Sequence, residues 1–295
     1  MNEVTGSTAG RFHGAAGSVR GSRPTLQSSM LQVEFAQLSD SGKVREHNED
    51  YLGYVVPITP SEARTRGWFF ALADGVGGHA QGEVASQAAV ETLLAGFKAA
   101  AAGEPLAALL GRLVQQANTR VFETALAAGR SGAGMATTLV CCSLRFDRVV
   151  VAHVGDSRCY LIRRGHATPL TRDHTFAGEQ VRLGLLSAKE AADAPTRHVL
   201  SRSLGTELLV NVDTSEHSVL PGDVLLLCSD GLHGAVNASE IAAIVREHAD
   251  LETAAHKLLS LANQKDGSDN SSVQLIRVRS VERMGTYRGL PYRLR

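Results

Sequence analysis

Acidic residues recur where apolar, strand-like runs of this 295-residue chain end or begin. The run from Trp68 to Ala73 stops at Asp74, and three glycines follow within four residues, at positions 75, 77 and 78. An Asp-Gly pair is a common turn signal. The same junction also suits a metal ligand held at a rigid strand end, where glycine lets another group approach the backbone.

The junction at Asp74 is one of several. The other acidic residues just before or after such runs are Glu49, Asp50, Asp156, Asp230 and Asp269. Strand ends of one domain can meet at one rim, where carboxylates repel each other unless cations lie between them. All-oxygen ligands suit Mg²⁺ or Mn²⁺, and a carboxylate shared by two ions is typical of two-metal hydrolysis. The alternative, that most of these aspartates only form turns, stays open.

Arg45 lies four residues before Glu49. An arginine beside a carboxylate cluster is most often an ion-pair partner, but its planar guanidinium also matches a phosphate group. Beside a two-metal site, the second interpretation indicates chemistry on a phosphate ester. The spacing alone leaves both interpretations open.

Seven short motifs follow one another in an order that resembles a known family. They are R-x-x-x-E-D (45–50), ADGVGG (73–78), GE-x-AS (82–86), MATTLV (135–140), VGDSR (154–158), SDGL (229–232) and SDNSSV (268–273). Any one of them is weak, but seven in this order are specific. Over about residues 33–279 the chain resembles the metal-dependent protein phosphatases, the type 2C serine/threonine phosphatases. Its motifs are similar to those of the bacterial branch of that family.

The resemblance implies an α+β fold, a four-layer α-β-β-α sandwich of two antiparallel sheets flanked by helices. It also implies a binuclear Mn²⁺ or Mg²⁺ site at the rim and a flap over it. In that site Asp74 should bridge both ions, and Gly75 should contribute its backbone carbonyl. Asp230 and Asp269 should hold the first ion, and Asp50 the second.

Further roles follow from the same resemblance. Glu49 should act on the second ion through water, and Asp156 with Asp230 should hold a third, weaker ion. Arg45 should bind the substrate phosphate, so that Arg45, Asp74 and Asp230 form the catalytic set. A water bridging the ions would then attack the phosphorus of phosphoserine or phosphothreonine, with no phosphoenzyme.

Val76 departs from part of the family. Some members, chiefly eukaryotic, have a histidine at this position as a proposed general acid, so the acid stays unassigned here. We expect His153, Asp173 and His174 to be structural. Two other functions remain as alternatives: a pseudophosphatase that serves as an interaction module, which the complete ligand set disfavours, and a hydrolase of small phosphoesters.

Hydrophobic patterning predicts the elements that position these residues. Strands are expected over 31–39, 51–57, 68–73, 223–228 and 272–280, with several short ones over 136–170. Helices are expected from 83, from 105, and over 187–194, 239–248 and 251–264. The domains expected are a disordered tail (1–30), the phosphatase domain (31–280) with its flap at about 171–205, and a C-terminal tail (281–295).

Composition narrows the class of partners. With 30 basic and 30 acidic residues the formal net charge is zero, so nothing indicates attraction to nucleic acid or an anionic membrane. Four cysteines lie in apolar runs without C-x-x-C spacing, as reduced core residues do: Cys141, Cys142, Cys159 and Cys228. Such cysteines suit a cytoplasmic protein, and we also expect a monomer. The family resemblance implies that it acts on phosphorylated proteins, among them a Ser/Thr kinase or its targets.

Overall fold

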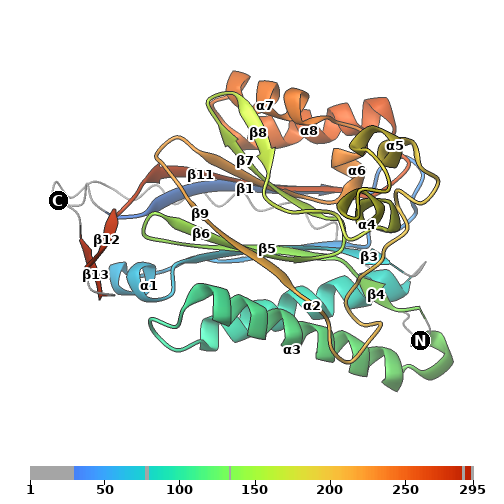
Figure 1. Ribbon diagram of the computed structural model, residues 1–295, viewed down its shortest axis with the longest axis horizontal. Coiled ribbons are helices and arrows are strands. Elements are labelled where there is room, and N and C mark those ends of the chain that lie inside the picture. Colours follow the sequence, from blue (N-terminus) through green and yellow to red (C-terminus); the bar gives the residue numbers. More distant parts are fainter. Residues whose placement is uncertain (1–29, 77–79, 133, 288–289, 294–295) are drawn as a thin grey trace, which may run out of the picture.

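Two antiparallel sheets lie face to face between two layers of helices (Figure 1). The computed structural model describes residues 30–76, 80–132, 134–287 and 290–293. The first sheet has, in spatial order, β1 (Gln32–Asp40), β11 (Ser271–Ser280), β10 (Val224–Cys228), β7 (Arg158–Arg163) and β8 (His166–Pro169). The second has β2 (Asp50–Val55), β3 (Trp68–Val76), β5 (Leu139–Arg145), β6 (Arg148–Val154) and β9 (Asp213–Ser218), and the short β4 (Ala136–Thr137) pairs with β3.

Helices cover the outer face of each sheet, which confirms the expected α+β sandwich. On the second sheet lie α2 (Ala80–Ala99) and α3 (Leu106–Ala127), and on the first lie α7 (Ala238–Glu247) and α8 (Leu251–Lys265). The starts of α7 and α8 are capped locally: the side chain of Asn237 accepts from the main chain of Glu240, and that of Asp250 accepts from the main chain of Thr253. Pro105, expected within the first turn of α3, is instead its N-cap residue.

Strand β3 shows why the sequences of the central strands are continuously apolar. Side chains alternate along a strand, so Phe69, Ala71 and Ala73 pack in the core under α2 and α3. Phe70 and Leu72 point the other way, into the core between the two sheets. Because both faces of β3 are covered, no polar alternation is left in its sequence.

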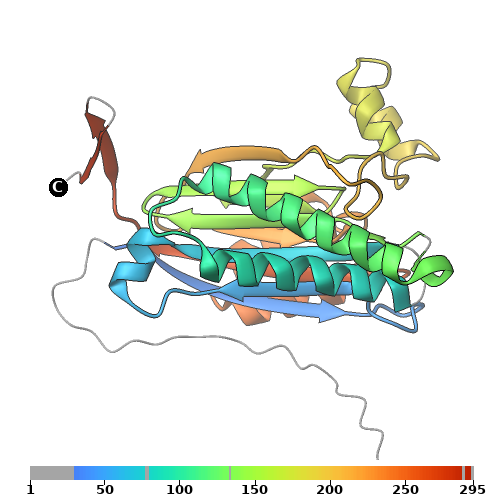
Figure 2. The same cartoon turned by 90° about the horizontal axis from the view of Figure 1, so that it is seen from below.

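A long segment joins the edge strands of the two sheets. It runs from residue 170 to residue 212, between β8 and β9, and we call it the flap. It contains α4 (Phe176–Arg182) and α5 (Ala188–Asp193), which project from one end of the sandwich (Figure 2). Helix α5 lies within the range 187–194 expected from the sequence and begins with a capping box of Ser187 and Glu190.

Several elements differ from the sequence-based expectations. The helices α1 (Pro60–Thr65) and α6 (Asp230–His233) and the 3-10 turn η1 (Gly129–Gly132) are too short to give a periodic signal, and β9 is a polar edge strand. The expected C-terminal tail contains an antiparallel hairpin, β12 (Met284–Tyr287) and β13 (Leu290–Arg293). The predicted disordered tail falls, up to residue 29, outside the described residues.

The four cysteines are buried and form no disulfide, as expected. Burial raises the pKa of the Cys141 and Cys228 thiols to about 12. They are therefore neutral core side chains at physiological pH. Within the described ranges, no helix combines the length and the apolar composition needed to cross a membrane.

Candidate active site

Asp50 and Asp74 face each other on neighbouring strands. The antiparallel register of β2 and β3 pairs them directly, and it pairs Leu52 with Leu72 two positions along. Both leucines belong to the packing between the sheets. Since side chains alternate along a strand, the two carboxylates also lie on the inner face of their sheet, where it reaches the rim.

Helix α6 brings a third carboxylate to this rim. Asp230 is its first residue rather than the last residue of a strand, and its charge is among those that raise the pKa of Asp74. The preceding Ser229 donates its Oγ–H to Asp50 Oδ2 at 2.8 Å. The short helix therefore fixes Asp230 beside the pair on β2 and β3.

Asp156 lies in the tight turn between β6 and β7. Its main-chain oxygen accepts a hydrogen bond from His233 Nε2 in α6 at 3.0 Å. The next residue, Ser157, is hydrogen-bonded through Oγ to Thr138 Oγ1 at 2.7 Å, and Thr138 Oγ1 also accepts from the Asp74 main chain at 3.1 Å. One hydroxyl thus ties the turn of Asp156 to the strand of Asp74.

Asn270 joins the loop before β2 to the start of β11. Its Nδ2 donates to the main-chain oxygens of Ser41 and His47 at 3.1 and 2.9 Å, and its Oδ1 accepts from the Glu49 main chain at 2.8 Å. Because Asp269 directly precedes Asn270, these bonds bring Glu49 and Asp269 to the same rim.

The surroundings of Gly75 show why a glycine follows Asp74. A Cβ at this position would lie 2.3 Å from the main-chain carbon and oxygen of Gly82, in the first turn of α2. A Cβ on Gly82 would in turn lie 2.8 Å from the carboxyl carbon of Glu49. The backbone that approaches Gly75 is therefore that of α2, and glycine is needed at both positions. Gly77 and Gly78 lie outside the described residues.

The electrostatics of Asp74 show how closely the acidic residues gather. Burial raises the pKa of Asp74 well above its usual range. The charges of four other carboxylates raise it further, in this order: Asp50, Asp230, Asp156 and Asp269. The structure thus brings together all the aspartates that the sequence singled out. Their repulsion is what a divalent cation would relieve.

Asp50 and Asp156 give a direct test of whether a cation fits. Burial raises the pKa of Asp50 to about 7, despite hydrogen bonds from Ser272 and Ser229. Its Oδ1 is buried and has no hydrogen-bond partner among the described residues. Burial, followed by the charge of Asp230, raises the pKa of Asp156 to about 8. A buried oxygen without a donor, in a set of oxygen ligands only, fits Mn²⁺ or Mg²⁺.

Arg45 is an ion-pair partner in this structure. Its Nη2 lies 2.9 Å from Asp269 Oδ2, and 48% of its side chain is exposed. The hydrogen bond to Asp269 raises the pKa of the guanidinium, and the charges of Asp269, Glu49 and Asp74 add to this. The structure therefore shows Arg45 as an ion-pair partner, and its role in binding the substrate phosphate stays a prediction.

We expect Arg45→Ala to raise KM for phosphosubstrates by about 10- to 100-fold with a smaller change in kcat, because a charge-assisted hydrogen bond contributes about 1.5–3 kcal/mol. Arg45→Lys should recover only part, since the bidentate fork is lost. Arg112→Ala is the matched control, because Arg112 is equally exposed and pairs with Glu104 away from the rim. Initial-rate kinetics measure both constants. An unchanged KM would show that Arg45 does not bind the phosphate and serves only as an ion-pair partner of Asp269.

Sequence reasoning missed a second polar cluster. Among the described residues, one group of His, Cys, Asp or Glu side chains has all its ligand atoms within 4.8 Å of one another: His153, His174 and Asp213. The acidic rim does not meet this criterion. The histidines were expected to be structural, but Asp213, at the start of the polar strand β9, carries no local signal.

The comparisons with known proteins agree with this geometry. The chain belongs to the protein phosphatase 2C family, whose model matches residues 43–266. It is 35% identical over 249 residues to "Serine/threonine phosphatase stp" of Listeria innocua, covering 83% of this chain and 95% of that protein.

Solved structures show the same fold. The serine/threonine phosphatase of S. agalactiae matches with a TM-score of 0.76 and 30% identity, over 84% of this chain and 100% of that one. The catalytic domain of the phosphatase PstP, solved with 2 manganese ions, matches with a TM-score of 0.72 and 32% identity, over 85% and 100%. The chain is a metal-dependent serine/threonine protein phosphatase.

Proposed function

We propose that the acidic rim is the catalytic centre, with Asp74 as the ligand shared by two Mn²⁺ or Mg²⁺ ions. Asp230, Asp269 and the carbonyl of Gly75 would hold the first ion, and Asp50 the second. The observation that carries this assignment is the position of Asp74, whose pKa is raised by burial and by the charges of four surrounding carboxylates. The buried, unpartnered Oδ1 of Asp50 supports it among the described residues.

Two further acidic residues complete the proposed site. Glu49 would act on the second ion through water, since its main chain is fixed beside Asp50 by Asn270. Asp156 would hold a third, weaker ion together with Asp230, whose charge is the strongest among those that raise the pKa of Asp156. Few protein ligands leave such an ion mostly hydrated and weakly bound.

The ions, when bound, supply a Lewis acid for the phosphoryl oxygens and lower the pKa of a bound water. The chain's own part is to orient the substrate. Arg45 would release Asp269 and bind the phosphate, where its charge stabilises the equatorial oxygens in the transition state. The four cysteines are buried, so none is available as a nucleophile.

The test is hydrolysis by the full chain of a panel of phosphoserine, phosphothreonine and phosphotyrosine peptides together with p-nitrophenyl phosphate. We expect the serine and threonine peptides to be hydrolysed with Mn²⁺ or Mg²⁺, and excess chelator to stop the reaction until the ion is restored. Full turnover in chelator would overturn the metal assignment. A preference for the small ester over every peptide would favour the alternative, a hydrolase of small phosphoesters.

We propose residues 31–280 as the catalytic domain. Met30 and Leu31 are buried, and the Met30 carbonyl accepts from Ser280 Oγ at 2.5 Å. The two ends of the packed domain therefore contact each other here. Deletion of residues 1–29 is expected to leave turnover of p-nitrophenyl phosphate within about twofold of the full chain. A deletion that also removes Met30 and Leu31 should lower the melting temperature, because buried apolar area is lost. Loss of activity in the shorter deletion would contradict the boundary.

We propose that the substrates are cytoplasmic phosphoproteins that include a Ser/Thr kinase or its targets, and that the protein acts as a monomer. The names of its relatives support phosphoproteins as the class of substrate. Phosphoproteomics of a deletion strain against its complemented strain would identify the substrates. Unchanged phosphoserine and phosphothreonine sites would contradict the proposal.

A further inference from the structure

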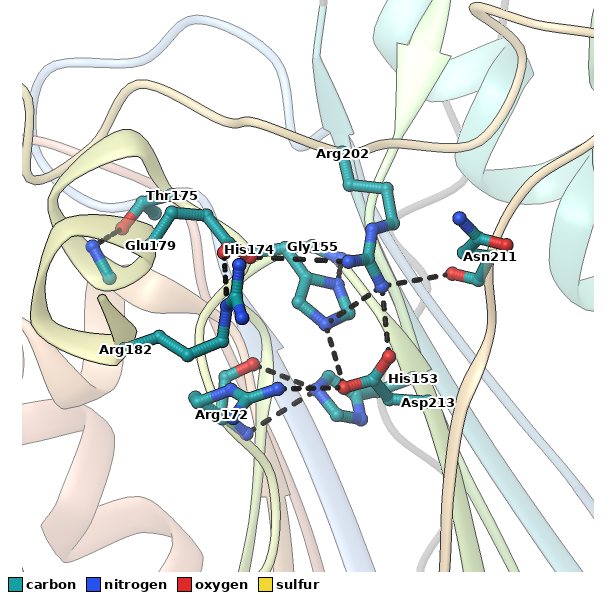
Figure 3. A network of polar contacts seen from close by, with 11 residues as sticks. His153, Gly155, Arg172, His174, Thr175, Glu179, Arg182, Arg202, Asn211 and Asp213 are labelled. Atoms are coloured by element: carbon teal, nitrogen blue, oxygen red, sulfur yellow. Dashed lines mark hydrogen bonds and ion pairs between the residues drawn. The ribbon is translucent and has the colours of Figure 1, made fainter.

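A polar network around two buried histidines joins the base of the flap to the edge of the second sheet (Figure 3). His174 lies at its centre, fully buried and directly before Thr175, the N-cap residue of α4. Its ring stacks on that of His153 in β6 with 4.6 Å between centroids. Asp213 of β9 accepts from Arg202 at 2.9 Å, and its Oδ2 lies 3.3 Å from His174 Nε2.

The network is already satisfied without a metal ion. Arg202 and Arg172 both contact Asp213, at 2.9 and 3.4 Å, so two guanidinium groups neutralise the one carboxylate. A further cation there would be repelled by both. The Nδ1 of His174 is also in use, because it accepts the main-chain N–H of Gly155 at 3.1 Å. The cluster therefore has another role.

The contact with Gly155 fixes the state of the His174 ring. Since Nδ1 accepts a hydrogen bond, the proton of the neutral ring is on Nε2, where it points to Asp213. Arg202 Nη1 also lies 3.2 Å from Nε2, but its two N–H groups are directed to the Asn211 carbonyl and to Asp213 Oδ1, so it does not need Nε2 as an acceptor. Burial, with the charges of His153 and Arg202, lowers the pKa of His174 to about 4, so the ring is neutral at physiological pH. Asp213 thus sets the tautomer that Gly155 needs.

Gly155 directly precedes Asp156 and has an unusual conformation. Its φ is +102°, and a Cβ there would lie 2.7 Å from the side chain of Thr138. Glycine adopts this conformation readily, and it alone leaves room for Thr138. His174 accepts the N–H on one side of this turn, and His233 donates to the Asp156 carbonyl on the other. The two histidines thus hold the main chain on either side of the Asp156 Cα.

We propose that His174, oriented by Asp213 and Arg202, is a positioning residue for Asp156, and that it couples the flap to the weak third metal site. The inference rests on the proposed function. The coupling path continues to α4, because Glu179 lies 4.0 Å from Arg202. A movement of the flap would change the hydrogen bond to Gly155 and so the affinity of the site at Asp156.

Two substitutions separate the two ends of the His174 ring. In His174→Asn the amide oxygen takes the position of Nδ1 and can still accept from Gly155. In His174→Gln the amide takes the position of Nε2, and the acceptor for Gly155 is lost. By calorimetric titration with Mn²⁺, His174→Gln should weaken the weakest site by about 10- to 100-fold, as changes around metal ligands do. The tight sites should persist, and His174→Asn should stay within about threefold of wild type.

Turnover gives a second readout that a purely structural role would not change. The rate of His174→Gln on a phosphoserine peptide should return toward wild type at saturating Mn²⁺, since only the affinity of one site is reduced. In an Asp156→Ala background the same substitution should cause no further loss, because it acts through Asp156. Asn118→Leu is the control: Asn118 is buried and holds Gly205 at 2.9 Å, but it does not contact the turn.

The inference is overturned if His174→Gln keeps the wild-type affinity of the weakest site, if its loss adds to that of Asp156→Ala, or if wild type shows no weak Mn²⁺ site. If melting curves show that His174→Gln does not fold, Asp213→Asn takes its place, with the same expected loss. Failure of the proposed function looks different, because wild type would then show no Mn²⁺-dependent hydrolysis of phosphopeptides.

Discussion

Asp74→Asn is expected to lower kcat on a phosphoserine peptide by about a thousandfold or more, which corresponds to about 4 kcal/mol of lost transition-state stabilisation. The reason is its place in the rim. The charges of four other carboxylates act on Asp74, which lies among them, so no other side chain can take over a ligand shared by two ions. Asparagine keeps the shape but loses the charge that a bridging ligand provides.

The same substitution should stabilise the protein when a chelator is present. Because the folded-state pKa of Asp74 is raised, the folded protein binds this proton more tightly than the unfolded chain does. Stability therefore falls as the pH rises above about 4, the pKa of an unfolded aspartate. The neutral asparagine of the variant avoids this loss, so the melting temperature at pH 7.5 should rise by about 2–4 °C for each kcal/mol regained.

Asp250→Asn is the matched control for both measurements. Asp250 caps α8, and its hydrogen bonds with Thr253 lower its pKa, which is the opposite shift. Its replacement should leave turnover unchanged and should not raise the melting temperature. Near wild-type turnover of Asp74→Asn at saturating Mn²⁺ would show that the bridging assignment is wrong.

The acidic rim could be predicted because its signals are local. Asp74 follows an apolar run buried on both faces, and the same junction returns at Asp156 and Asp230. Each local pattern gives a strand and its end, and the family resemblance supplies the sandwich that brings these ends together. For Asp50 and Asp74, which lie on paired strands, the direction of the carboxylate then follows from the alternation of side chains.

The groups that hold these carboxylates could not be predicted in the same way. Ser229, Thr138 and Asn270 act through hydrogen bonds to residues far away in the chain, and a hydroxyl or amide in a loop has many possible partners. His174 and Asp213 are separated by a flap whose path the sequence does not specify. The phosphate-binding role of Arg45 also stays a prediction, because the structure shows only its ion pair with Asp269.

Asp156→Ala is expected to slow hydrolysis of a phosphoserine peptide by about a hundredfold or more. The loss of rate on p-nitrophenyl phosphate should be about ten times smaller than the loss on the peptide. A seryl oxygen needs a proton as it leaves, and general acid catalysis contributes about 10²–10⁴-fold. p-Nitrophenolate leaves as a stable anion and needs little help. Val76 offers no acid at its own position, and we expect the site at Asp156 to supply the proton instead.

The turn at Asp156 suits this separate role. It is attached to α6 by His233, whereas Asp50 and Asp74 lie on paired strands of the second sheet. Calorimetry of Asp156→Ala should therefore still show the two tight metal sites. Ser157→Ala is the control, because it removes the hydroxyl contact to Thr138 but keeps the carboxylate. Equal losses on both substrates would exclude an acid role for this site, and loss of tight binding would show that Asp156 belongs to the binuclear pair.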